Sequence, residues 1–135
     1  MQTLIDVTKE RNTKLHETEK IKAKRKPIDA FEKLRFYATQ GYDSIPDDDK
    51  NIFLKSFGIF DKPETANCFI IRVRVPGGQL NLKQAKCLAD LAQKFSDGML
   101  KIAKGMQVEL LQVGIENIPM VLEKLLDVGL TTLQT

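Results

Sequence analysis

One predicted β-strand constrains this fold most, because residues 69–76 are mostly β-branched or aromatic yet include two arginines, Arg72 and Arg74. Side chains two residues apart on a strand share a face, so we expect both guanidinium groups on one side of a sheet. The apolar residues around them predict that the other side is buried, and Pro76-Gly77-Gly78 ends the strand. A cation in such a strand needs an anionic partner. The pattern therefore indicates either a structural ion pair or an anion-binding site.

The residues after this strand predict the order helix, strand, strand, helix. The expected elements are a helix over residues 82–95, strands over 99–103 and 107–115, a helix over 117–129, and a fourth strand from residue 130. Asn81 is the predicted N-cap of the first helix, Lys104-Gly105 is the predicted turn of the hairpin, and Gly129 is the predicted end of the second helix. This βαββα order is typical of a ferredoxin-like α+β fold.

Residues 69–78, Phe-Ile-Ile-Arg-Val-Arg-Val-Pro-Gly-Gly, resemble the signature that opens the ferredoxin-like half-domain of siroheme-dependent sulfite and nitrite reductases. The resemblance extends to an acidic turn and a Leu-Lys-Ser-Phe-Gly-Ile-Phe segment within residues 47–60, and to residues 114–119 and 123–132. It covers residues 28–132 in all. It implies that residues 68–135 form a ferredoxin-like half-domain, truncated so that its last strand is incomplete.

The resemblance also implies a chemistry, the six-electron reduction of sulfite or nitrite on a siroheme coupled to a 4Fe-4S cluster in a larger parent enzyme. Arg72 matches the family position that contacts the substrate anion, while Arg74, Lys101 and Lys104 are the expected siroheme-contacting cations. We expect an N-terminal half-domain or fragment that is inactive alone and whose partners are the remaining half-domains. The alternative is a stand-alone, non-catalytic binding module that uses its exposed sheet to pair with a partner or with itself.

Three positions of the predicted hairpin depart from the family pattern. Gly105 stands where the family has an arginine, Glu109 where it has a glutamine, and Leu111 where it has a histidine. A carboxylate at position 109 would repel the carboxylates of siroheme. These departures are consistent with the alternative of a module that has lost siroheme binding, whereas the reductase half-domain or fragment is the first expectation.

The residues before the first strand fall into two segments. Residues 1–26 form a charged arm with few apolar residues, for which we expect no order independent of a neighbouring molecule. The arm has no aromatic residue to stack on a base and the chain is only +3, so we do not expect nucleic acid as a partner. Residues 27–67 form a lead-in with a predicted helix over 28–41 and a short helix over 50–57, capped by the aspartates at 47–49.

Metal-binding and membrane-spanning patterns are missing from the sequence. Cys68 and Cys87 are too few and too far apart for a recognised metal motif, and His16, the one histidine, lies in a polar segment. We therefore expect no metal ligands and no cofactor in the isolated chain. The chain has neither an apolar run of membrane-spanning length nor a signal peptide, which predicts a cytoplasmic location.

Overall fold

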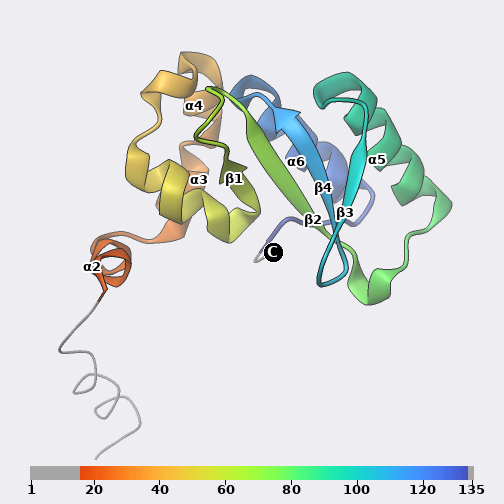
Figure 1. Cartoon of the computed structure of the whole chain (residues 1–135), viewed down its shortest axis with the longest axis horizontal. Coiled ribbons are helices and arrows are strands. Elements are labelled where there is room, and N and C mark those ends of the chain that lie inside the picture. The colour runs from red at the N-terminus through yellow and green to blue at the C-terminus, as the bar shows by residue number, and fades with distance from the viewer. Residues whose placement is uncertain (1–15, 134–135) are drawn as a thin grey trace, which may run out of the picture.

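A computed structural model describes residues 16–133, and in it a single four-stranded antiparallel sheet is backed by two long helices (Figure 1). The strands are β1 (Ile59–Asp61), β2 (Phe69–Arg74), β3 (Leu100–Ala103) and β4 (Gln107–Val113), in the spatial order β1-β2-β4-β3. The helices are α2 (Glu17–Lys24), α3 (Pro27–Glu32), α4 (Leu34–Gln40), α5 (Leu82–Phe95) and α6 (Ile118–Asp127). The predicted βαββα order is confirmed as β2, α5, β3, β4 and α6.

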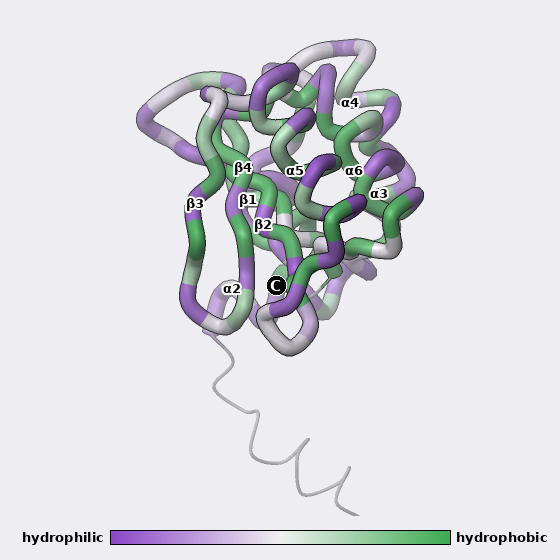
Figure 2. Tube along the Cα trace, turned by 90° about the vertical axis from the view of Figure 1, so that its right-hand side faces the viewer, coloured by the Kyte–Doolittle hydropathy of each residue, from purple (hydrophilic) through white to green (hydrophobic). Residues whose placement is uncertain are grey.

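Alternating burial along β2 explains the two layers of the fold. Phe69, Ile71 and Val73 are completely buried, whereas the residues between them are more exposed. The buried side chains pack toward α5 and α6, and Figure 2 shows the sheet and these helices as separate layers. Among the described helices, none covers the opposite face of the sheet in this view. We call that opposite face the outer face.

The two long helices form where the sequence predicts them. Asn81 caps α5, because its side chain accepts a hydrogen bond from the Gln84 backbone N–H at 2.8 Å while Gln84 Oε1 accepts from the Asn81 backbone N–H at 3.1 Å. Helix α6 ends before Gly129, whose φ of 77° suits glycine. Both helices turn an apolar stripe toward the sheet; the buried members are Leu88, Leu91, Ala92, Ile118, Val121, Leu122 and Leu125.

The lead-in contributes to the same hydrophobic core. Ala30, Leu34 and Tyr37 of α3 and α4 are buried in one cluster with residues of β2, β4, α5 and α6. The predicted helix over 28–41 is present as two helices, and residues 50–57 form a π-helical turn (Asp49–Phe53) followed by a 3₁₀ turn (Leu54–Phe57). No described helix is both long and apolar enough to cross a membrane.

The edge of the sheet beside β2 differs from the sequence prediction. In place of the expected fourth strand, Thr131 forms a single antiparallel bridge with Arg74. The Arg74 backbone N–H donates to the Thr131 carbonyl at 2.8 Å. Beside it, β1 pairs with residues 69–71, and the Gly58 carbonyl accepts from the Arg72 N–H at 2.9 Å. Gly58 makes this possible because its φ of 71° ends the preceding helical turn. Two segments distant in sequence thus share one sheet edge.

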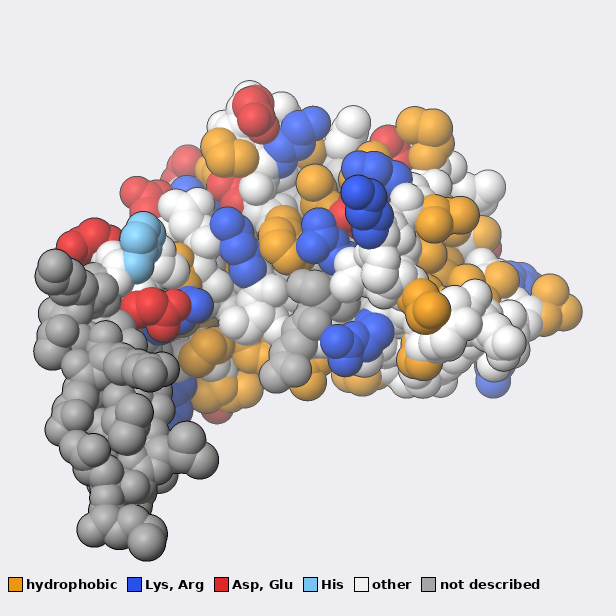
Figure 3. All heavy atoms as spheres, turned by 60° about the horizontal axis from the view of Figure 1, so that its bottom comes forward, with side chains coloured by type: hydrophobic (Ala, Val, Ile, Leu, Met, Phe, Trp, Pro, Cys, Tyr) orange, Lys and Arg blue, Asp and Glu red, His pale blue; other side chains and the backbone are white. Residues whose placement is uncertain are grey.

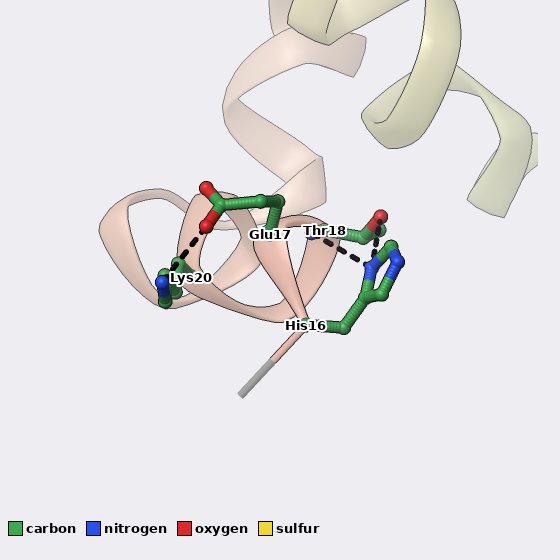
Figure 4. Close-up of polar contacts among 4 residues, drawn as sticks. All are labelled: His16, Glu17, Thr18 and Lys20. Carbon is green, nitrogen blue, oxygen red and sulfur yellow. Dashed lines mark hydrogen bonds and ion pairs between the residues drawn. The ribbon is translucent and has the colours of Figure 1, made fainter. Parts of the chain in front are cut away.

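The described part of the arm is a short helix. In α2 the His16 Nδ1 accepts from the Thr18 N–H at 3.3 Å, and Glu17 pairs with Lys20 at 2.8 Å (Figure 4). His16 is therefore the N-cap of α2. The helix buries no residue completely. The expectation about order in the arm falls mainly on residues 1–15, which lie outside the described residues.

Candidate functional site on the outer face of the sheet

Arg72 and Arg74 both lie on the outer face, as their spacing predicts. The residues that alternate with them along β2 are buried in the core, so the pleat directs both guanidinium groups away from α5 and α6. Figure 3 shows Lys and Arg side chains gathered across the middle of one face of the molecule, while most acidic side chains in that view lie toward one end. Arg72 and Arg74 therefore bring two positive charges to the outer face.

Strand register brings Arg72, Glu109 and Lys101 into one row across three strands. Glu109 on β4 is opposite Arg72 on β2 and also opposite Lys101 on β3. Arg72 Nε and Nη2 both lie 2.9 Å from Glu109 Oε1, and Lys101 Nζ lies 3.4 Å from Glu109 Oε2. The Glu109 side chain is only 5% exposed, whereas Arg72 is 30% and Lys101 63% exposed. One nearly buried carboxylate therefore joins two cations that reach solvent.

Phe60 fixes the other side of Arg72. The guanidinium carbon lies 4.3 Å from the centre of the Phe60 ring, a cation–π contact. Phe60 is in β1, which pairs with β2 through residues 69–71. Arg72 is thereby held between an aromatic ring and a carboxylate. From the sequence, Phe60 is recognised only as the last residue of the Leu-Lys-Ser-Phe-Gly-Ile-Phe segment and is not predicted to belong to the site.

A second row of the outer face contains Arg74, Gln107 and Ala103. Lys104 follows Ala103 directly, in the exposed turn that joins β3 to β4. Gly105 adopts a φ of 79° in this turn, and a Cβ added there would meet nothing within 4 Å. The four cations predicted from the sequence, Arg72, Arg74, Lys101 and Lys104, therefore lie at neighbouring positions. Arg72 and Lys101 both contact Glu109.

Leu111, the third departure from the family pattern, lies at an irregularity in β4. The register between β2 and β4 shifts by one residue between Phe69 and Ile71, and Gln112 has a φ of 58°. This is a β-bulge, which re-aims side chains locally. The Leu111 carbonyl accepts a hydrogen bond from Ser96 Oγ. The Leu111 backbone therefore has a partner in the segment after α5.

The aspartates at 47–49 do not form the predicted helix cap, because no side-chain cap hydrogen bond is present at that helical turn. Asp49 is instead completely buried, where it accepts hydrogen bonds from Arg25 and from the Tyr37 hydroxyl. Burial, followed by the hydrogen bond to Asp49, raises the pKa of Tyr37 to about 12. Asp49 thus connects Arg25, at the end of the arm, with Tyr37 in the core. No sequence pattern predicts this network, because Asp49 is 12 residues from Tyr37 and 24 residues from Arg25.

No group of three potential metal ligands is present among residues 16–133. Cys68 is buried and Cys87 partly buried, and both are free thiols. Burial raises the pKa of the Cys87 thiol. Neither cysteine lies in the outer-face rows, whose ionisable side chains are Arg72, Arg74, Lys101 and Glu109.

Comparisons with known proteins agree with this architecture. Residues 61–128 match the family model described as the nitrite/sulfite reductase ferredoxin-like half domain. Over 90% of its length the chain is 31% identical to a ferredoxin–nitrite reductase of Synechococcus elongatus, and over 87% it is 27% identical to a ferredoxin-dependent sulfite reductase of Mycobacterium tuberculosis. The solved structure of the NirA protein of Mycobacterium tuberculosis superposes with a TM-score of 0.82 at 26% identity, covering 89% of this chain and 25% of that one. The chain spans about a quarter of the length of the relatives it matches.

Proposed function

The chain belongs to the nitrite/sulfite reductase ferredoxin-like half-domain family, and we propose that it forms one wall of the anion site in a larger siroheme and 4Fe-4S reductase of nitrite or sulfite. In this proposal the chain alone is inactive and holds no cofactor. Its partners are the remaining half-domains of the parent, and its location is cytoplasmic. When bound, siroheme and the cluster would supply the electron transfer, while this chain would supply cations.

One observation carries the proposal, the gathering of Arg72, Arg74, Lys101 and Lys104 on adjacent positions of the outer face of the sheet. Cations fixed on strands suit a reaction that concentrates negative charge on its substrate, because they are oriented before the charge develops. The resemblance assigns Arg72 to the substrate anion and the other three to siroheme carboxylates, and Arg72 and Lys101 could take these roles only where Glu109 gives way to the incoming anion. Arginine and lysine are the side chains that bind such groups most strongly.

The two rows of the outer face contain different residues. The row of Arg74 holds Gln107 and Ala103, with Lys104 beside it. The row of Arg72 does not suit a further anion, because Glu109 already occupies the space between Arg72 and Lys101. We therefore derive no chemical step through siroheme at Arg72.

A second candidate is a binding module without siroheme. Two features favour it: Glu109 offsets positive charge of Arg72 and Lys101, and the edge of the sheet at β3 is exposed. Strand β3 lies at that edge, and its Ile102 is 85% exposed. An exposed edge strand with apolar side chains is a template for pairing with another chain. If this candidate holds, the isolated chain associates with itself, and Ile102→Lys returns it to the monomer in sedimentation experiments.

A chimera tests the first candidate against the second. In the Synechococcus elongatus reductase, the quarter that aligns with this chain is replaced by residues 16–133, and the purified chimera is compared with the parent for siroheme content by absorbance. The half-domain proposal predicts retained siroheme. A chimera that is folded by circular dichroism yet contains no siroheme would reject the proposal and support the binding module.

A further inference from the structure

The Glu109 carboxylate contacts both Arg72 and Lys101. We infer that Glu109 acts as an internal counter-anion that keeps Arg72 and Lys101 from binding a small oxyanion, so that this one residue sets the anion affinity of the outer face. The inference rests on the proposed function, because it concerns the same face. It goes further by naming the residue that decides whether the face binds an anion.

The geometry of the contacts supports this role. Arg72 directs Nε and Nη2, two donors of one edge of the guanidinium group, at the same Glu109 oxygen, each at 2.9 Å. That edge is the fork with which arginine binds planar oxyanions and carboxylates. Glu109 Oε2 faces Lys101 at 3.4 Å, so both carboxylate oxygens are engaged. An incoming anion would have to displace Glu109 to reach the same donors.

Burial and charge make Glu109 hard to displace. The side chain is 5% exposed, so a rotation that released Arg72 would leave a nearly buried carboxylate with only Lys101 as a counter-ion. The three charges sum to +1 with Glu109 in place and to +2 with a neutral glutamine, which has nearly the same shape. Glutamine accepts from Arg72 but brings no negative charge to repel an anion.

The test titrates the chain with sulfite, nitrite and acetate in turn and monitors binding through the NMR shifts of the Arg72 and Lys101 side chains. Sulfite and nitrite stand for the substrate, and acetate stands for a carboxylate of siroheme. We expect Glu109→Gln to bind at least one of the three about tenfold more tightly than the original chain, since a charge-assisted hydrogen bond is worth at least that factor. Glu123→Gln, which removes the same charge from the exposed side of α6, is the matched control and should not change the affinity.

Two outcomes would overturn the inference. The first is a folded Glu109→Gln variant whose affinity for all three anions equals that of the original chain. The second does not depend on that variant: sulfite, nitrite or acetate at low millimolar concentration that shifts the Arg72 and Lys101 signals of the original chain would show that Glu109 does not keep anions from these cations. The titration uses the isolated chain, so its result is independent of siroheme retention in the chimera, which tests the proposed function alone.

Discussion

Replacing Arg72 by alanine should destabilise the fold because it leaves Glu109 nearly buried with a weaker partner. Removing one member of a buried ion pair costs about 3–5 kcal/mol. Here the cost is reduced, because Arg72 is 30% exposed and Lys101 remains 3.4 Å from the carboxylate, so we expect about 2 kcal/mol. Loss of the cation–π contact with Phe60 adds about 0.5–1 kcal/mol. The free energy of unfolding should therefore fall by about 2–3 kcal/mol.

Urea denaturation followed by circular dichroism measures this change. For a chain of this size the midpoint should fall by about 1–2 M. Arg35→Ala, at an exposed position of α4, is the matched control and should change stability by less than about 0.5 kcal/mol. Combining Arg72→Ala with Glu109→Gln should restore part of the loss, since no stranded carboxylate remains. The reasoning is refuted if Arg72→Ala behaves like Arg35→Ala, because Glu109 would then not depend on Arg72.

Three further predictions concern the rest of the chain. Asp49→Asn should lower the free energy of unfolding by about 3 kcal/mol, because Asp49 is completely buried beside Arg25. Asp48→Asn, at an exposed position, is the control, and equal effects of the two changes in urea denaturation would contradict the prediction. The raised pKa of Tyr37 favours the protonated phenol in the folded state, so this contribution to stability is present below pH 10 and is lost as the pH rises toward 12. Ultraviolet titration should accordingly show tyrosine ionising at lower pH in the unfolded than in the folded chain, and identical curves would refute the assignment. Metal analysis of the purified chain should find no stoichiometric iron, and one iron per chain would show that a ligand set was overlooked.

The sequence predicted those features that depend on local patterns. Alternation along β2 placed Arg72 and Arg74 on one face, and the spacing of Asn81 and Gln84 is that of a capping box. Strand β1 was missed because three residues are too few to show alternation, and its order comes from pairing with β2. Its pairing also explains why the expected fourth strand is reduced to one bridge, since both use the same edge.

The contacts of the site depend on register, which sequence spacing does not give. Glu109 was interpreted from the sequence as a repulsive neighbour of siroheme, and the structure shows its partners to be Arg72, 37 residues earlier, and Lys101 on the adjacent strand. Asp49 was interpreted as a cap because it precedes a helical turn, but its partners lie on α4 and at the end of the arm. In both cases a buried carboxylate required cations or donors that only the tertiary fold brings near.

The central claim, that the outer face forms a wall of the siroheme and anion site, is tested most directly by removing charge from each face of the chimera in turn. Arg74→Ala and Lys104→Ala remove cations of the outer face, whereas Lys86→Ala and Lys94→Ala remove exposed cations of α5 on the opposite layer. The measurement is siroheme content per folded chain. We predict that Arg74→Ala and Lys104→Ala each lower the affinity of the chimera for siroheme by about tenfold, and so lower its siroheme content. Lys86→Ala and Lys94→Ala should change neither quantity. Equal siroheme content in all four variants would contradict the claim.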